Sequence, residues 1–243
     1  MKVLVIIPAA GLGTRMASAA RERPTKPAAT KQFTELVGVP VLVRTLARFA
    51  NSPDISTIYV ALRASEIEPF RARLERDFPE IHGKNPVLVE GDEHRQGSVA
   101  NALAQITASS DDIILVHDAV RPFVTDEMIH GVVEAAKHYG AAIAGIPAVD
   151  TVKQVERTAE GALIKATIPR QQVVLAQTPQ GFRYDVLKKA FDEALTDGFT
   201  GTDEASLVER SGHEVAVVMG SPRNIKITNP ADFELAEFYL KHP

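Results

Sequence analysis

The sequence predicts an α/β fold in which a mostly parallel sheet lies between layers of helices. Short runs of Val, Ile and Leu recur along the first 150 residues, and segments with helical spacing separate them. A strand that is apolar on both faces is typical of a parallel sheet covered by helices. Strand–helix alternation also favours right-handed crossovers. We therefore expect strands at 3–7, 56–62, 87–89, 113–116 and 141–146.

The helices between these strands have local start signals. Pro40 suits the first position of a helix, where its missing N–H costs nothing. Ser65 and Glu68 form a capping-box pattern at the start of the next helix. A further helix is expected at 98–106, and Thr125 is a good N-cap for the helix that follows it. Each signal places a helix between two predicted strands, as the fold class requires.

The alternation breaks at Pro147, and the next residues predict a β-hairpin arm. Residues 151–155 and 162–166 have an extended pattern, and residues 158–161 form a good turn between them. A lone hairpin is barely stable in water. We therefore expect residues 148–170 to pack on another surface, and a second copy of the chain is the economical partner.

The rest of the chain completes one predicted domain that spans residues 1–243. The expected elements are a strand at 173–176, a helix at about 184–195, a helix opened by Thr202-Asp203-Glu204, a strand at 215–219, an extended segment at 224–228 and a C-terminal helix that starts at Asn229-Pro230.

Composition excludes several classes of function. The chain has 243 residues, of which 45% are hydrophobic and 24% charged, as in ordinary globular proteins. A net charge of −4 leaves no basic excess for a nucleic-acid surface. The absence of Cys excludes disulfides and thiolate metal sites, and no apolar run approaches the length of a membrane span. Because the N-terminus does not resemble a signal peptide either, we expect a cytoplasmic protein.

The first strand leads into a loop of small residues that predicts a phosphate site. Residues 8–16 are Pro-Ala-Ala-Gly-Leu-Gly-Thr-Arg-Met. Side chains this small let the backbone N–H groups of residues 9–13 approach an anion, and Arg15 adds a fixed cation. The loop lacks the Gly-Lys-Ser/Thr end of a Walker loop, and Met16 stands where a dinucleotide fingerprint needs a small residue. A tight turn without a ligand is the alternative to a polyphosphate cradle.

Other polar and glycine positions also follow predicted strands. Gly91 and Asp118 each lie two positions beyond the end of one. In open α/β sheets, ligands bind beyond the carboxyl ends of the strands. We therefore expect the loops at Gly11, Gly91 and Asp118 to meet at one edge of the sheet. Either Lys26 or Lys31 is expected to fold back onto a phosphate there, with a solvated loop as the alternative.

Several motifs follow one another along the chain. Each is weak evidence alone, and only the whole ordered set is specific. They are Pro8-Ala9-Ala10-Gly11-x-Gly13-x-Arg15-Met16, Lys31-Gln32-Phe33, Gly91-x-x-x-Arg95-x-x-Ser98-Val99, His117-Asp118-Ala119-x-Arg121-Pro122, Gln177-Thr178-Pro179-Gln180, Thr202-Asp203-Glu204-Ala205-Ser206 and Asn224-Ile225-Lys226-Ile227-Thr228. Together they resemble the 2-C-methyl-D-erythritol 4-phosphate cytidylyltransferases of the non-mevalonate isoprenoid pathway, over nearly the whole chain. The resemblance implies a Rossmann-like three-layer αβα fold of the nucleotide-diphospho-sugar transferase type.

The resemblance also implies a reaction. The phosphate of methylerythritol phosphate would attack the α-phosphorus of CTP and release pyrophosphate, with Mg²⁺ on the phosphates. The chemistry needs no general base, because a phosphate monoester is already mostly dianionic at neutral pH. Cations and backbone donors would stabilise the charge that develops on the phosphoryl oxygens.

The same resemblance implies roles for individual residues. The catalytic cations would be Arg15, Lys31, Arg170 and Lys226, with Lys26 as a rival to Lys31. CTP would contact Pro8, Ala9, Ala10, Gly11, Gly13, Gly91, Ser98, Asp118, Ala119 and Thr178. The acceptor would contact Asp118, Arg121, Thr151, Lys153, Arg170 and Lys226. Asp118 would also hold Mg²⁺, and the arm would complete the partner's site in a homodimer.

Alternatives to this function are open at this point. A ribitol 5-phosphate cytidylyltransferase shares the cradle and the Asp118 motif, so only the acceptor pocket separates the two activities. A sugar-nucleotide pyrophosphorylase would use another base. A non-catalytic nucleotide-binding protein of the same fold is an alternative of a different class. One departure from the family pattern concerns base recognition, because Asp92 stands where the family usually has a second glycine.

Overall fold

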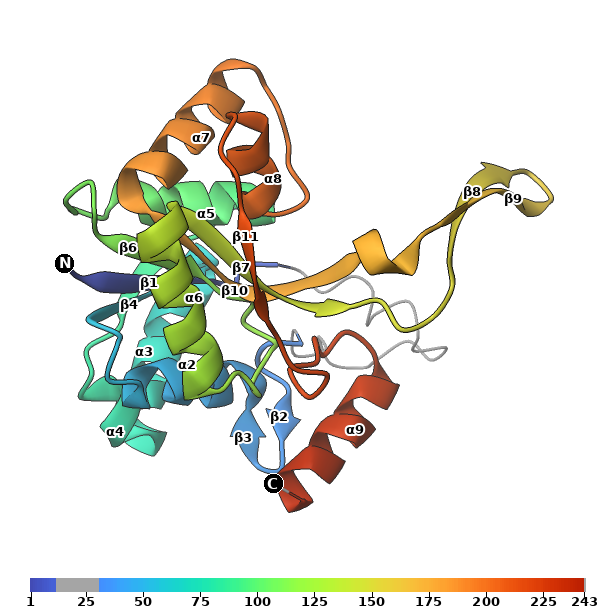
Figure 1. Cartoon of the computed structure of the whole chain (residues 1–243). Coiled ribbons are helices and arrows are strands. Elements are labelled where there is room, and N and C mark those ends of the chain that lie inside the picture. Colours follow the sequence, from blue (N-terminus) through green and yellow to red (C-terminus); the bar gives the residue numbers. More distant parts are fainter. Residues whose placement is uncertain (12–30, 243) are drawn as a thin grey trace.

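A seven-stranded sheet with the strand order β11-β7-β10-β6-β1-β4-β5 forms the centre of the molecule (Figure 1). The computed structural model describes residues 1–11 and 31–242. The strands of this sheet are β1 (Val3–Pro8), β4 (Thr57–Leu62), β5 (Val87–Glu90), β6 (Ile113–Val116), β7 (Ala141–Pro147), β10 (Val174–Arg183) and β11 (Ala216–Met219). The other elements are β2 (Glu35–Leu36), β3 (Val39–Pro40), α2 (Val41–Asn51), α3 (Ala64–Asp77), α4 (Pro79–His82), α5 (Arg95–Ala104), α6 (Asp126–Tyr139), β8 (Val152–Thr158), β9 (Gly161–Ile168), the 3₁₀ turn η1 (Arg170–Gln172), α7 (Tyr184–Thr196), α8 (Glu204–Arg210) and α9 (Pro230–Lys241).

The sheet is parallel apart from β10, which confirms the predicted fold class. β1 pairs in parallel with β4 and β6, and the pairs β4–β5 and β7–β11 are parallel too. β10 is antiparallel to both of its neighbours, β6 and β7. The chain returns from β7 to β10 through the hairpin arm, without a crossover helix, and such a connection joins antiparallel strands.

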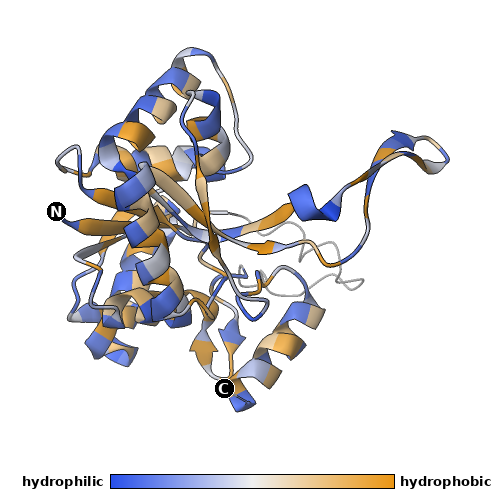
Figure 2. Ribbon diagram, viewed as in Figure 1, coloured by the Kyte–Doolittle hydropathy of each residue, from blue (hydrophilic) through white to orange (hydrophobic). Residues whose placement is uncertain are grey.

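Helices on both faces of the sheet explain the uniformly apolar sequence of β1. Val3, Val5 and Ile7 belong to one core, which also holds buried residues of α2, α3 and α6. Leu4 and Ile6 belong to a second core with residues of α5 and α7. Successive side chains of a strand point to opposite faces, so a strand between two cores needs apolar residues at every position. Figure 2 shows apolar residues concentrated in these central strands.

The predicted helix starts differ in how well they match the structure. Thr125 caps α6, because its hydroxyl accepts a hydrogen bond from the N–H of Met128 at 3.3 Å. The capping box predicted at Ser65 is wrong, because α3 already begins at Ala64 and its start has no side-chain cap. Pro40 ends β3 and precedes the first residue of α2. None of the helices in the described part of the chain is long and apolar enough to cross a membrane.

The predicted hairpin is present and leaves the main sheet. β8 and β9 form a separate antiparallel pair, in the register Val152 to Ile168 and Thr158 to Gly161. The pair extends away from the body of the molecule in Figure 1. Gly161 has a φ of +147°, a conformation that other residues rarely adopt, and it therefore suits the turn. The side chains of the arm are mostly exposed.

A third, smaller core fixes the segment between β11 and α9 beside the loop that follows β6. Its buried members include Val41, Val120, Ile227 and Ala236. The N–H of Ile227 also donates to the carbonyl of Val120 at 2.9 Å. This anchor places residues 224–228, including Lys226, next to the carboxyl end of β6.

Candidate active site

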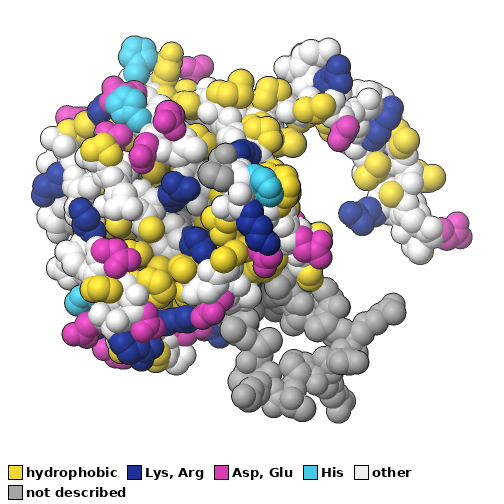
Figure 3. All heavy atoms as spheres, turned by 90° about the horizontal axis from the view of Figure 1, so that it is seen from below, with side chains coloured by type: hydrophobic (Ala, Val, Ile, Leu, Met, Phe, Trp, Pro, Cys, Tyr) yellow, Lys and Arg dark blue, Asp and Glu magenta, His cyan; other side chains and the backbone are white. Residues whose placement is uncertain are grey.

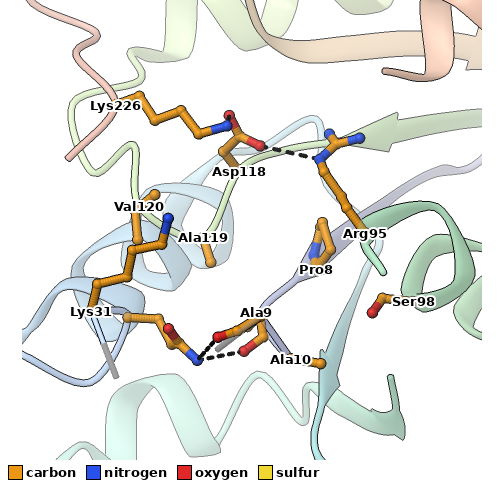
Figure 4. Close-up of a pocket in the computed structure, with 12 residues that line it drawn as sticks. Pro8, Ala9, Ala10, Lys31, Arg95, Ser98, Asp118, Ala119, Val120 and Lys226 are labelled. Atoms are coloured by element: carbon orange, nitrogen blue, oxygen red, sulfur yellow. Dashed lines mark hydrogen bonds and ion pairs between the residues drawn. The ribbon is translucent and has the colours of Figure 1, made fainter. Parts of the chain in front are cut away.

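A cavity of about 220 Å³ lies at the edge of the sheet where β1 and β6 end. Figure 4 shows side chains from several separate segments pointing towards it. Its lining consists of Pro8, Ala9, Ala10, Gly11, Lys31, Gln32, Arg95, Ser98, Asp118, Ala119, Val120 and Lys226. The loop after β1 and the loop after β6 therefore meet at one edge, as we expect from a parallel sheet. Below, this space is called the cradle cavity.

The loop after β1 is held in place by its neighbours. The amide of Gln32 donates to the carbonyl of Ala9 at 2.7 Å and to that of Gly11 at 3.3 Å. The N–H of Ala9 donates to the carbonyl of Ala61 at 2.7 Å, which continues the β1–β4 ladder. The expectation that the N–H groups of residues 9–13 all face an anion is therefore wrong for Ala9.

Three of the predicted site residues, Gly13, Arg15 and the rival Lys26, lie outside the described residues. Lys31 is described, and it lines the cradle cavity across from Arg95 in Figure 4. The cavity thus has a cation on either side.

Gly91 lets the loop after β5 lie against the loop after β1. A Cβ atom at Gly91 would lie 2.6 Å from the Cβ of Ala10, so no side chain fits there. The buried hydroxyl of Ser98 accepts from the N–H of Asp92 at 2.9 Å and donates to its carbonyl at 3.0 Å. The carboxylate of Asp92 occupies the space beside Gly97, where an added Cβ would be 2.0 Å from Oδ2. Asp92 therefore directs its side chain towards α5.

Three cations surround the buried carboxylate of Asp118. Nζ of Lys226 lies 3.0 Å from its Oδ2, and Nε of Arg121 donates to the same oxygen at 3.1 Å. Nε of Arg95 donates to Oδ1 at 3.4 Å. Burial opposes ionisation of this carboxyl, but the nearby Arg95, Lys226 and Arg121 hold the pKa of Asp118 well below its ordinary value. The carboxylate of Asp118 thus holds three cations close together, and an incoming polyanion can also interact with them.

The backbone at Asp118 is fixed by a buried hydrogen-bond chain. Nε2 of His117 faces the carbonyl of Arg121 at 3.0 Å, and because a carbonyl only accepts, Nε2 carries the proton of the neutral ring. Nδ1 therefore accepts from the hydroxyl of Thr178 at 3.1 Å, and the same hydroxyl accepts from the N–H of Asp118 at 3.1 Å. Burial lowers the pKa of His117 to about 4, so the ring is neutral at neutral pH.

A second cavity of about 200 Å³ adjoins the first. The two cavities share Arg95, Asp118 and Lys226. The remaining residues of the second lining are Arg121, Ala176, Gln177, Thr178, Gln180, Thr202 and Asp203. Asp203 is the N-cap of α8 and accepts from the amide of Gln180 at 2.7 Å, which gives it a structural role. We call this space the adjoining cavity.

The arm residues of one copy do not line either cavity. Nη1 of Arg170 donates to the carbonyl of Val149 at 2.6 Å. Nζ of Lys153 donates to the hydroxyl of Thr167 across the hairpin at 2.7 Å. Thr151, Lys153 and Arg170 are thus separated, within a single copy, from the residues around Asp118.

Sequence reasoning gave no role to Arg95, Gln32, His117 or Glu204. Glu204 is 1% exposed, and both of its oxygens lie within 2.7 Å of Nη1 of Arg95. Both residues occur in quoted motifs, but 109 positions separate them. No local pattern joins positions so far apart, so only the fold reveals the pair.

The donor set can be tested against the Mg²⁺ that the resemblance implies. Within residues 1–11 and 31–242, no group of three or more His, Asp or Glu side chains is placed to hold a metal ion. Asp118 supplies one hard carboxylate next to the cation-lined space. Mg²⁺ in nucleotide sites is usually held by one or two carboxylates together with substrate phosphates. The residues therefore fit a metal that arrives with a nucleotide.

The fold and the site together define a class of protein. Two adjoining cavities that share cations at the carboxyl edge of an open α/β sheet suit a transferase that brings two anionic ligands together. The family described as 2-C-methyl-D-erythritol 4-phosphate cytidylyltransferase matches residues 3–242. The chain belongs to this family, whose members are nucleotidyltransferases.

Individual members of this family are similar to the chain over nearly their full lengths. A 2-C-methyl-D-erythritol 4-phosphate cytidylyltransferase of Acidobacterium capsulatum is 56% identical, over 99% of this chain and 98% of the relative. One of Solibacter usitatus is 49% identical, over 99% and 96%. The crystal structure of the Francisella tularensis enzyme of that name is 35% identical, with a TM-score of 0.78 and coverage of 98% and 99%. That of Thermus thermophilus is 33% identical, with a TM-score of 0.75 and coverage of 99% and 100%.

Proposed function

We propose that this protein transfers the cytidylyl group of CTP to 2-C-methyl-D-erythritol 4-phosphate. A phosphate oxygen of the acceptor forms a bond to the α-phosphorus, and the bond from that phosphorus to the β-phosphate oxygen breaks. The products are 4-diphosphocytidyl-2-C-methyl-D-erythritol and pyrophosphate. The observation that carries the proposal is the group of Arg95, Asp118 and Lys226, which the cradle cavity and the adjoining cavity share.

The cradle cavity is assigned to CTP. Its lining includes the small residues Ala9, Ala10, Gly11 and Ser98. Such a space favours a pyrimidine over a purine by size. Lys31 and Lys226 line the same cavity and would neutralise the triphosphate. Arg15, which follows the cradle in sequence, is proposed as a further cation on these phosphates.

The adjoining cavity is assigned to the acceptor phosphate. Arg121 lines it, together with the shared Lys226. Thr178, which we expect from the sequence to contact CTP, lines this cavity and not the cradle cavity. The acceptor dianion and the triphosphate repel each other, so the barrier falls when fixed cations lie between them. Lys226 is the group that we place between the two phosphates. No proton has to be removed from the attacking oxygen, because the second pKa of a phosphate monoester is near 6.

Mg²⁺ is proposed to bind together with the nucleotide. Asp118 would hold it, with oxygens of the triphosphate as further ligands. When bound, the metal would add positive charge next to the phosphoryl oxygens. Arg95, Arg121 and Lys226 already neutralise Asp118, which supports a metal that enters only when the triphosphate attracts those cations away.

We also propose that the chain, as one domain over residues 1–243, works as a homodimer. The arm at 148–170 and the adjacent strand ends expose several large apolar side chains, namely Val149, Val155, Leu163, Ile164, Val174 and Leu175. Hydrophobic side chains are visible along the arm in Figure 3. Burial of these side chains against a second copy would stabilise a hairpin that is isolated in one copy. Thr151, Lys153 and Arg170 would then reach the acceptor in the partner's site.

The decisive experiment measures pyrophosphate release with CTP and each of two acceptors. Methylerythritol phosphate should be turned over much faster than ribitol 5-phosphate, and CTP should be preferred to UTP and ATP. The named relatives favour this acceptor. A preference for ribitol 5-phosphate, a preference for another nucleotide, or no release with any pair would each overturn the proposal in favour of one of the alternatives.

A further inference from the structure

The ion pair between Arg95 and Glu204 joins the site to a helix that otherwise lies outside it. Arg95 is the first residue of α5, and Glu204 is the first residue of α8. Nη1 of Arg95 lies 2.6 and 2.7 Å from the two oxygens of Glu204. Nε of the same guanidinium donates to Asp118. Arg95 is therefore held between two carboxylates on separate elements.

Glu204 belongs to neither cavity lining, and it contacts the site through Arg95. Burial raises the pKa of its carboxyl, and the adjacent guanidinium opposes that rise. Glu204 is buried and Arg95 is partly exposed, and desolvation of the buried charge offsets much of what such a pair contributes to stability. Its presence beside the shared edge of two cavities points to a role in the site.

We propose that Glu204 is a positioning residue for the cytidylyl transfer: it fixes Arg95, Arg95 orients the carboxylate of Asp118, and Asp118 places Lys226 between the two cavities. The inference rests on the function proposed above. The two oxygens of Asp118 have different partners: Oδ1 faces Arg95, whereas Oδ2 faces Lys226 and Arg121. The orientation of this carboxylate therefore depends on the position of Arg95.

Loss of the charge at position 204 changes which cations each oxygen of Asp118 contacts. Without a carboxylate behind it, the guanidinium of Arg95 has Asp118 as its nearest anion and moves towards it. The carboxylate of Asp118 then turns, and Lys226 loses its position. Arg95 and Lys226 also line the cradle cavity, so the binding of CTP weakens together with the chemical step.

The test compares Glu204→Gln with Asp112→Asn in the full-length protein. Asp112 is also a buried carboxylate, but it lies at the opposite edge of the sheet, where it accepts from the N–H groups of Lys2 and Ser109. Glu204→Gln should lower kcat by about tenfold or more, as loss of a group that orients a reactive ligand does, and should also raise the KM for CTP. Asp112→Asn should lower the thermal midpoint and leave kcat unchanged. Equal kcat for both variants and the wild type would overturn the inference.

A double-mutant cycle separates positioning from packing. Glu204→Met should have no further effect on kcat in the Arg95→Met background, because the group through which it acts is gone. The double variant replaces an ion pair with apolar side chains and should fold at least as well. A folded double variant with wild-type kcat would mean that the pair serves only the fold.

Crystal structures of the variants give a readout that does not depend on turnover. In Glu204→Gln the Asp118–Lys226 contact should be lost, and in Asp112→Asn it should be kept. An unchanged Asp118 in Glu204→Gln would contradict the inference even if the wild type proved inactive with CTP and methylerythritol phosphate. Inactivity of the wild type, by contrast, would contradict the proposed function.

Discussion

The side-chain amide of Gln32 lies 2.7 Å from the carbonyl oxygen of Ala9 and is almost completely buried. Because the same amide also reaches the carbonyl of Gly11, one side chain determines the course of the loop that we assign to CTP. The loop is therefore shaped by a residue that comes after it in sequence.

Replacement of Gln32 by Glu should disrupt this loop. A carboxylate cannot donate to the two carbonyls, and a buried polar group left without a hydrogen-bond partner costs about 1–3 kcal/mol of stability. We expect a loss of that size in the free energy of unfolding, measured by urea titration, and at least about tenfold weaker CTP binding by calorimetry. Gln105→Glu makes the same chemical change at an exposed helix end and is the control. Unchanged CTP affinity in Gln32→Glu would contradict the role of Gln32.

The buried His117 predicts a loss of stability in acid. The unfolded chain takes up a proton at the ordinary pKa of 6.5, whereas the folded protein resists protonation down to about 4. Stability is therefore present above pH 6.5 and is lost as the pH falls from 6.5 towards 4, by up to about 3 kcal/mol. His117→Asn should lower the stability at neutral pH and show a flatter dependence over this window. Parallel urea-unfolding curves for the two proteins across the window would refute this explanation.

Metal binding should depend on the nucleotide. Asp118 is the carboxylate that we assign to Mg²⁺, and three cations already surround it. Calorimetry with Mg²⁺ alone should show no binding, whereas Mg²⁺ should bind in the presence of CTP. Asp118→Asn should weaken the binding of Mg²⁺ in the presence of CTP. Tight binding of Mg²⁺ to the nucleotide-free protein would show that the metal site is formed by the chain alone.

Mixed dimers test whether the arm acts in the partner's site. Lys226→Ala removes a cation from the cavities, and Arg170→Ala removes one from the arm. Each variant should be nearly inactive alone. After unfolding and refolding together in equal amounts, half of the dimers are mixed, and each contains one intact site. We therefore expect about a quarter of the wild-type rate. No gain over the separate variants would place Arg170 in the site of its own chain.

The fold class follows from the sequence because a parallel sheet between two helical layers needs strands that are apolar at every position. β1 meets this requirement with Val3, Leu4, Val5, Ile6 and Ile7, which divide between the two cores. The hairpin is predictable because residues 151–155 and 162–166 have extended patterns and residues 158–161 suit a turn between them. The antiparallel direction of β10 depends on the path through the arm, which no local pattern specifies.

The site was predictable only in part. Asp118 and Lys226 are marked by their motifs, but their contact depends on a third core in which Ile227 bonds to Val120. The start of α3 was mispredicted because β4 leads directly into the helix, so Ser65 already lies inside its first turn. Arg95 and Glu204 were given no role, because buried charge pairing across 109 residues leaves no signal in the linear sequence.

The most direct test of the account is a crystal structure of the protein with CTP. It should place the cytosine beside Ala9, Ala10 and Ser98, and the triphosphate beside Lys31 and Lys226. CTP bound elsewhere, or with its phosphates directed away from the cations around Asp118, would contradict the assignment of the cradle cavity.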